Sequence, residues 1–510
     1  MKLETSSSLS SVAVAIILAC LYVCKVSLSK KNSLPPGPPG EIILGHFRII
    51  PTNNPEYEYM RWSEEYKSDI LGFHMPGKTI IVLNSVRAAM DLLDKRGGNY
   101  SDRPDFILFM AMGWEKTLTF LRAGPMFKKH RSMLQRAFSK SNIVQFRPWQ
   151  ELQARIMLKG FSERPWDWEH ILRRFATAVI MGIAHGVKID NDSSPFIEMA
   201  EKASYALGHG GAPAGTPVDY FPFIRHLPRI FHDQTLRNAM KWRQDIRNIH
   251  EEPYKAAVSS DERAPSILQG LLDQLEEHKK SGKDSNMTES DVKGAAAAVY
   301  AAGQDTVWSS IVVFILNMVL HPEVQSKAQS MIDQVVGRDR LPSYEDRPKL
   351  PYVEFIVQET LRWCPVSPLG VPHRAMQDDQ YKGYLIPKGA LVYANARAMT
   401  HDATVYNNPD AFDPDRYISV ADGGRGEPFP VGHFGFGRRK CVGLHLAEAS
   451  IWIVVVSMLS TFDIKRDLDQ DGHELVPKVK LTNGLTSHPE RFPCRIVGRD
   501  EKAIAMVQAC

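Results

Sequence analysis

The sequence has few of the features that mark secreted or nucleic-acid-binding proteins. Only six of its 510 residues are cysteines, at positions 20, 24, 364, 441, 494 and 510. Their spacing gives no disulfide framework, which is typical of a reducing compartment. The formal net charge is only +4, so nothing indicates a nucleic-acid partner. A small basic excess suits a membrane surface or an acidic protein partner.

The chain also lacks internal repeats, long low-complexity segments and any motif for a flavin or nicotinamide cofactor. Gly435 and Gly437 could begin a dinucleotide fingerprint, but Lys440 stands where the third glycine would be. Cys441 and His445 have no second Cys/His pair at the spacing of a zinc site. A reaction that consumes electrons would therefore receive them from another protein.

A membrane-length apolar stretch precedes the main body, at residues 9–28. About 20 residues can span a bilayer if Lys25 extends its charged end to the interface. A secretory signal is the alternative, but the stretch ends in lysines without a small-residue cleavage site. The lysines at 25, 30 and 31 place the following chain in the cytosol by the positive-inside rule.

We therefore predict a short N-terminal segment (1–8), a transmembrane anchor helix (9–28) and a basic and proline-rich linker (29–40), followed by the main body (41–510). By length alone the chain would hold about three domains. The linker prolines cannot extend a helix, so we expect a stiff spacer between the bilayer and the body. Three glycosylation sequons begin at Asn99, Asn191 and Asn286. With the body in the cytosol, we expect none of them to be used.

The most informative segment is the loop 434–443, FGFGRRKCVG, which sets Cys441 among glycines and arginines. An apolar helical pattern follows from 444 to about 459. A helix N-terminus and nearby cations favour the thiolate form of a cysteine. Such a thiolate can be a metal or haem ligand, a nucleophile or a redox centre, and a structural free cysteine is the common alternative.

The pattern Phe-x-x-Gly-x-Arg-x-Cys-x-Gly, formed by Phe434, Gly437, Arg439, Cys441 and Gly443, resembles the haem-ligand loop of the cytochrome P-450 family. At average usage of about 5% per position, a chance match in such a chain is expected at roughly 2 in 10,000. The resemblance implies that Cys441 is the axial iron ligand and that Arg439 pairs with a haem propionate. Phe434, Gly437 and Gly443 complete this expected cofactor-binding loop, whose glycines allow a close approach to the macrocycle.

A long helix with a capping-box pattern at its start is predicted over residues 288–320. Its middle, 302–306, places Asp305 and Thr306 in otherwise apolar sequence. Small residues packed against a neighbouring helix would explain Gly303, but buried polar groups need partners or a function. The segment resembles the oxygen-binding segment of the family. This implies that Gly303 makes room for dioxygen, and that Asp305 and Thr306 relay protons.

Further haem contacts are implied by the same resemblance. Arg374, in Pro-His-Arg, matches a strand position where an arginine binds a propionate. Phe127 stands at a helix position where the family usually has tryptophan, so the indole N–H donor is lost. Either His130 or Arg131 must then supply that propionate contact.

A charge cluster is expected behind the haem loop. Glu359 and Arg362 are three residues apart and can pair on one helix face. The segment 412–417 resembles the family segment that supplies a second arginine, here Arg416. We expect the three side chains to be buried together in a structural role.

The resemblance covers residues from about 35 to 493 and implies the cytochrome P-450 fold, mainly α with small β-sheets, in a single large catalytic domain after an N-terminal membrane anchor. The implied cofactor is haem b with a thiolate-ligated iron. The implied electron source is NADPH through NADPH-cytochrome P-450 reductase, with cytochrome b5 as a further donor. A basic face of Lys128, Lys129, Arg438 and Lys440 is expected to bind the reductase, although a merely solvated basic face has the same composition.

The expected reaction inserts one oxygen atom of O2 into a lipophilic substrate, aromatic or terpenoid- or steroid-like. The segments resemble fungal microsomal members, which implies secondary metabolism or xenobiotic oxidation at the endoplasmic reticulum membrane. We expect substrate contacts in five segments: 102–121, 205–223, 297–306, 366–371 and 483–486.

Two other functions remain open. One is a haem-thiolate isomerase, dehydratase or peroxide-using enzyme, whose members commonly lose the acid–alcohol pair that this chain keeps. The other is a non-catalytic haem-binding or gas-sensing protein, for which a complete proton relay would be unnecessary.

Overall fold

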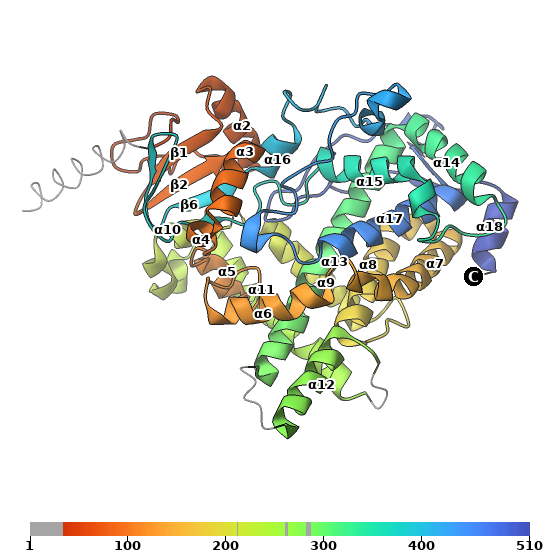
Figure 1. Ribbon diagram of the computed structural model, residues 1–510, viewed down its shortest axis with the longest axis horizontal. Coiled ribbons are helices and arrows are strands. Elements are labelled where there is room, and N and C mark those ends of the chain that lie inside the picture. The colour runs from red at the N-terminus through yellow and green to blue at the C-terminus, as the bar shows by residue number, and fades with distance from the viewer. Residues whose placement is uncertain (1–33, 212, 261–263, 282–286, 510) are drawn as a thin grey trace, which may run out of the picture.

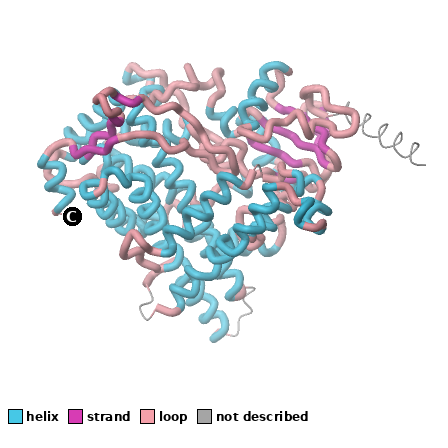
Figure 2. Tube along the Cα trace, turned by 180° about the vertical axis from the view of Figure 1, so that it is seen from behind, coloured by secondary structure: helices cyan, strands magenta, loops and turns pink. Residues whose placement is uncertain are grey.

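The computed structural model describes residues 34–211, 213–260, 264–281 and 287–509. The anchor predicted at 9–28, the first part of the linker and the sequon at Asn286 lie outside these described residues. Helices make up most of the described chain. β1, β2 and β6 lie together at one end, and α14 and α18 lie at the other (Figure 1). Figure 2 shows from behind that small groups of strands lie at both sides of a large helical body.

The helices are α2 (Pro55–Glu65), α3 (Val86–Ala89), α4 (Gly97–Tyr100), α5 (Ile107–Met112), α6 (Pro125–Ala137), α7 (Arg147–Glu163), α8 (Trp168–His185), α9 (Pro195–His209), α10 (Pro217–Tyr220), α11 (Gln234–Val258), α12 (Ile267–Lys280), α13 (Glu289–Leu320), α14 (Pro322–Val336), α15 (Pro351–Trp363), α16 (Ala396–Thr400), α17 (Leu444–Thr461) and α18 (Glu501–Gln508). The strands are β1 (Ile70–Met75), β2 (Lys78–Leu83), β3 (His373–Arg374), β4 (Asp379–Tyr381), β5 (Tyr384–Ile386), β6 (Leu391–Ala394), β7 (Phe462–Lys465), β8 (Asp467–Leu468), β9 (Glu474–Leu475) and β10 (Arg495–Gly498).

The core is built around α13 and α17. Both helices are long and apolar enough to cross a membrane, but about four-fifths of each apolar stretch is buried inside the body. A helix that is apolar on all sides needs protein contacts all round, and this explains their central position. α13 begins with the predicted capping box, in which the Thr288 hydroxyl accepts from Asp291 N–H and the Asp291 carboxylate accepts from Thr288 N–H.

The largest sheet has four strands in the order β1-β2-β6-β3. β1 and β2 form an antiparallel hairpin, β6 runs parallel to β2, and β3 is antiparallel to β6. This sheet carries β3, a strand of only two residues, to the edge of the candidate site.

The described part of the proline-rich segment packs against this sheet. Gly72 N–H on β1 donates to the Pro36 carbonyl at 3.0 Å, and a Cβ on Gly72 would lie 2.7 Å from the Pro35 carbonyl oxygen. A side chain at position 72 would therefore push the segment away. We predicted a spacer through residue 40, but the packed body already includes residues 35–37.

Candidate active site

An inner cavity lies between α13, the loop before α17, α6 and the β3–β6 edge of the sheet. Cys441 opens into this cavity from the loop and is otherwise enclosed by protein. Its N–H donates to the Phe434 carbonyl at 2.8 Å, which closes the loop. Gly437 adopts a φ of +53°, and a Cβ there would collide with the Leu93 carbonyl oxygen. The loop therefore needs glycine at this position.

Opposing effects act on the pKa of the Cys441 thiol. Burial raises the pKa of Cys441 above its ordinary value, and the N–H groups of Gly443 and Leu444 and the charge of Arg131 offset this only in part. Gly443 is the N-cap of α17, so Cys441 lies two residues before the cap. The N–H groups at the start of α17 thus act on Cys441 in the direction that the sequence predicts, although burial has the larger effect. A thiolate at Cys441 stays a prediction. A coordinated metal ion would deprotonate the thiol directly.

Positive charge gathers at one edge of the inner cavity. Arg439 donates from Nε to the Ser101 carbonyl (2.7 Å) and from Nη2 to the Leu121 carbonyl (2.8 Å). Its Nη1 is buried and has no hydrogen-bond partner within the described part of the chain. Arg103 also lines the cavity, and it donates to the carbonyls of Thr119 and Pro372.

The electrostatics of this edge favour an anionic ligand. Burial and the Arg439 charge hold the pKa of Arg103 well below its usual range, and burial lowers the pKa of Arg439 to about 10. Among the described residues that line the cavity, Asp305 is the one carboxylate, and it belongs to α13. A haem would fit this arrangement, with a thiol for the iron and guanidinium groups for its propionates.

α6 presents two of its predicted residues to the cavity and turns the third away. Phe127 and Arg131, four residues apart, both line the cavity. The Arg439 guanidinium lies 3.5 Å from the centre of the Phe127 ring, so the ring supports a cation here. His130 instead faces the start of α13, where its Nε2 lies 3.3 Å from Asp291. Of the two donors that we expected to replace tryptophan, the structure brings only Arg131 to the site.

Arg374 does not reach the cavity, and its neighbour His373 does. Successive residues of a strand point to opposite faces. His373 on β3 therefore lines the cavity with its Nδ1 against the Tyr100 carbonyl (2.7 Å), while Arg374 lies 3.9 Å from Asp102 outside it. Sequence reasoning missed both His373 and Arg103. The Pro-His-Arg motif held the signal for His373, but Arg103 lies in a segment without regular periodicity.

The oxygen-binding segment predicted on α13 borders the cavity. Thr306 Oγ1 donates to the Ala302 carbonyl at 2.9 Å, and Asp305 accepts a hydrogen bond from the Ser204 hydroxyl on α9. The backbone of Gly303 lines the cavity, but a Cβ there would meet the Ile180 side chain of α8 at 2.6 Å. In this fold the missing side chain of Gly303 lets α8 and α13 pack closely.

The predicted charge cluster forms away from the inner cavity. Glu359 pairs with Arg362 Nε at 2.8 Å and with Arg416 Nε at 3.1 Å, and all three side chains are fully buried. Two residues that the sequence did not indicate complete it. Tyr417 OH donates to Glu359 at 2.9 Å, and Glu427 pairs with Arg416 at 2.6 Å.

All five segments that we expected to contact substrate contribute to the cavity lining, which is mostly apolar. The large apolar residues of the first segment are Phe106, Phe109, Met110, Met112 and Trp114. Only Trp114 among these five lines the cavity. Phe106 and Phe109 instead pack on Phe120, with ring centres 5.2 and 5.0 Å apart.

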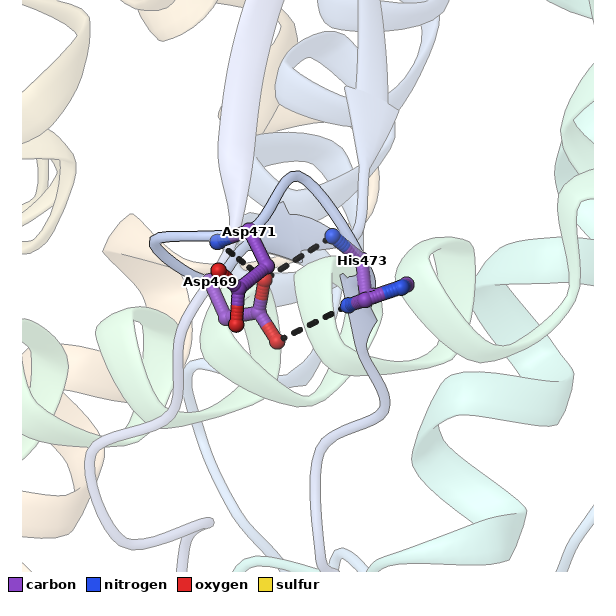
Figure 3. Close-up of side chains that lie close together, drawn as sticks. All are labelled: Asp469, Asp471 and His473. Carbon is purple, nitrogen blue, oxygen red and sulfur yellow. Dashed lines mark hydrogen bonds and ion pairs between the residues drawn. The ribbon is translucent and has the colours of Figure 1, made fainter.

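One exposed group of side chains on the described surface has the composition of a metal site: Asp469, Asp471 and His473 (Figure 3). It lies on the turn between β8 and β9. Asp469 already accepts hydrogen bonds from the N–H groups of Asp471 and His473, at 2.9 Å each. Such bonds are typical of an Asx turn, so we interpret the group as part of the hairpin.

Comparison with known proteins gives a consistent result. The family model described as Cytochrome P-450 matches residues 35–492. A cytochrome P-450 monooxygenase of Armillaria gallica is 36% identical over 98% of this chain and 99% of its own length. Tryptamine 4-monooxygenase of Psilocybe cyanescens is 34% identical over 97% of this chain and 99% of its own. A zebrafish cytochrome P-450 structure with abiraterone, 24% identical, aligns with a TM-score of 0.69 over 88% of this chain and all of that one, which shows the shared fold.

Proposed function

Because this chain belongs to the cytochrome P-450 family and is an oxygen-incorporating oxidoreductase with a haem-thiolate cofactor, we propose that it oxidises a lipophilic small molecule with electrons from NADPH supplied by a separate reductase. The observation that carries this proposal is the shared cavity of Cys441, the acid–alcohol pair and an apolar lining. Fungal secondary metabolism or xenobiotic oxidation is the proposed setting.

In this proposal Cys441 ligates the haem iron, and Arg103, Arg131, Arg439 and His373 hold the propionates. Bound haem supplies the activation of dioxygen. The residues of the chain position the reactants around it. Phe127 supports the Arg439 guanidinium from one side, and the apolar lining excludes water from the substrate.

Thr306 and Asp305 are proposed to hold and move protons on the α13 side of the cavity. The Thr306 hydroxyl donates to a helical carbonyl, so its oxygen can accept a further hydrogen bond from water in the cavity. Asp305 Oδ2 is buried without a hydrogen-bond partner among the described residues. A buried carboxylate oxygen in this state is suited to binding a proton or water.

The electron donor is proposed to bind where α6 meets the haem loop. Arg131 on α6 donates to the Lys440 carbonyl, so the two elements are in contact. Lys128, Arg438 and Lys440 are exposed there. Lys129 forms an ion pair with Asp291 at 2.9 Å, and we therefore leave it out of the proposed docking face.

Membrane attachment at the endoplasmic reticulum is proposed to involve a second contact besides the N-terminal anchor. Phe47 packs on Tyr220 and Phe221, which joins the 41–50 loop to the 221–231 segment. Large apolar side chains project from both, among them Ile42 (91% exposed), Ile230 and Phe231. Protein that begins at Pro35 should still sediment with phosphatidylcholine vesicles, and Ile230→Ser with Phe231→Ser should release it.

The proposed monooxygenase function is tested by reductase-supported NADPH oxidation with a set of apolar substrates. Thr306→Ala should keep the carbon monoxide complex and the substrate-induced spectral change, but should divert NADPH into peroxide. Thr306→Ser retains a hydroxyl and should keep most of the coupling. An isomerase or a sensor would show no substrate-dependent NADPH oxidation in the unaltered protein.

A further inference from the structure

A second cavity, here called the outer cavity, opens to solvent beside α8 and α9. Trp166 and Tyr205 stand at its rim and are 73% and 55% exposed. Its lining is rich in ionisable groups, unlike that of the inner cavity. They are Asp167, Glu169, His170 and Arg173 beside α8, Glu201, Tyr205 and His209 on α9, and His488 and Arg491 near the C-terminus.

The two cavities lie on opposite sides of a thin wall. Three helices each give one residue to the inner cavity and another, three positions away, to the outer cavity. These pairs are Ala176 and Arg173 on α8, Leu207 and Ser204 on α9, and Asp305 and Trp308 on α13. Three residues rise about 4.5 Å along a helix, so roughly one turn separates the cavities.

A hydrogen bond crosses this wall. The Ser204 hydroxyl, which faces the outer cavity, donates to Oδ1 of Asp305, which faces the inner cavity. Asp305 is only 1% exposed. Its other oxygen, Oδ2, has no hydrogen-bond partner among the residues described. Asp305 is therefore connected to the outer cavity through Oδ1, while Oδ2 can still bind a proton or a water molecule.

The outer side of the wall is charged. The Arg173 guanidinium lies 3.7 Å from the centre of the Trp308 ring, and its Nε is 3.8 Å from Glu201. Asp305 and Glu201 both stabilise the Arg173 cation, although burial lowers its pKa. His170 lies 3.7 Å from Glu201, and this contact raises the pKa of His170. His170 therefore carries more charge near neutral pH than a free histidine would.

We propose that the outer cavity takes in the protons that the reaction consumes, and that Ser204 passes them to Asp305. The inference rests on the proposed monooxygenase function. Ser204 gives its hydroxyl proton to the Asp305 carboxylate as it accepts one from water in the outer cavity, and that water is reprotonated from His170 or solvent. Asp305 then releases a proton toward Thr306 and becomes a carboxylate again. Two such transfers, with two electrons from NADPH, convert one oxygen atom of O2 to water.

Replacement of Ser204 tests the route. Ser204→Ala should slow the proton-dependent step by about 10²–10⁴-fold, the usual contribution of a positioned proton-transfer group. The product formed per NADPH should therefore fall, and the solvent deuterium isotope effect should rise. Ser204→Thr retains a hydroxyl and should restore both. Ser309→Ala is the matched control, because Ser309 is buried on α13 and lines neither cavity.

Peroxide-driven turnover separates proton supply from general damage. Hydrogen peroxide brings both the electrons and the protons, since substrate and peroxide give product and water. Ser204→Ala should therefore leave peroxide-driven turnover unchanged. An unchanged ratio of product to NADPH, or an equal loss with peroxide, would overturn the proposal.

A readout without turnover completes the design. The infrared carboxylate stretching band that disappears in Asp305→Asn should shift in Ser204→Ala and return toward its original position in Ser204→Thr. A band that does not respond to Ser204 would contradict the hydrogen bond across the wall. Failure of the unaltered enzyme to oxidise any substrate with NADPH would instead count against the monooxygenase function, and the infrared comparison would still decide whether Ser204 and Asp305 are coupled.

Discussion

At the residue scale, the edge of the inner cavity combines two buried guanidinium groups with a histidine. Burial and the charges of both neighbouring arginines hold the pKa of His373 well below its ordinary value. A bound propionate would oppose this shift and favour the protonated imidazole, whose Nε2 can donate to it. The Arg439 and Arg103 charges also repel each other. An anionic group bound between them would relieve that repulsion.

Arg103→Gln should therefore weaken haem retention, while Arg374→Gln should not. Arg103 lines the cavity, whereas Arg374 lies outside it near Asp102. The haem-to-protein ratio after purification and the rate of haem transfer to an acceptor apoprotein measure the effect. Circular dichroism checks that both variants are folded. If the Arg103 variant keeps its haem and the Arg374 variant loses it, Arg374 holds a propionate, as the sequence suggested.

Cys441→Ala should abolish the thiolate-type spectrum of the reduced carbon monoxide complex. Cys441 is the one described cysteine that lines the inner cavity. Cys364→Ala is the control, because Cys364 is also a free thiol but is buried elsewhere. Survival of the thiolate spectrum in the Cys441 variant would remove this residue as the iron ligand.

At the element scale, α15 is tied to the segment before the haem loop by Glu359. Its carboxylate pairs with Arg362 on its own helix and with Arg416 across the chain, and it also accepts from the Asp413 N–H at 2.8 Å. Glu427 pairs with Arg416 from further along the same segment. Removal of Glu359 would leave two buried guanidinium groups short of negative charge.

Glu359→Gln should lower the free energy of unfolding by about 3–5 kcal/mol, the usual cost of breaking a buried pair on one side. Glu58→Gln provides a matched control, since Glu58 and Arg61 form an ion pair at the same i, i+3 spacing but on the surface. Exposed pairs contribute at most about 1 kcal/mol. Denaturant titration followed by circular dichroism compares the two. Similar losses of unfolding free energy in both variants would mean that burial of the cluster does not increase its contribution to stability.

At the scale of the whole molecule, function depends on how separate surfaces serve one cavity. The proposed docking face lies where α6 contacts the haem loop, and the outer cavity opens beside α8 and α9. Electrons and protons would then reach the inner cavity through different parts of the body. The delivery of electrons and the delivery of protons can therefore each be altered by substitutions outside the lining of the inner cavity.

Reductase-supported turnover of the unaltered enzyme should fall at high salt. The double variant Lys128→Glu with Lys440→Glu should show the same loss of turnover already at low salt. Exposed charges more than about 8 Å apart are largely screened at physiological ionic strength. Lys279→Glu is the control, because Lys279 is also exposed but belongs to α12. Peroxide-driven turnover should be unaffected in all three proteins. Equal loss in both modes would assign these lysines to folding or haem retention.

The sequence alone determined the family, the haem loop and the central helix. These features are contiguous, so residue spacing, capping residues and periodicity specify them locally. The same holds for Glu359 and Arg362, whose i, i+3 spacing puts them on one helix face. The spacing of residues within the loop 434–443 was sufficient to identify Cys441 as a candidate ligand.

Only the tertiary structure decided which side chains share a site. β3 has two residues, too few for a periodic pattern, so its inward residue became visible only through pairing with β6. The stacking of Arg439 on Phe127, the pairing of Glu427 with Arg416 and the bond from Ser204 to Asp305 join separate segments. Such contacts are set by the packing of whole helices and sheets against each other, and local sequence carries no information about that geometry.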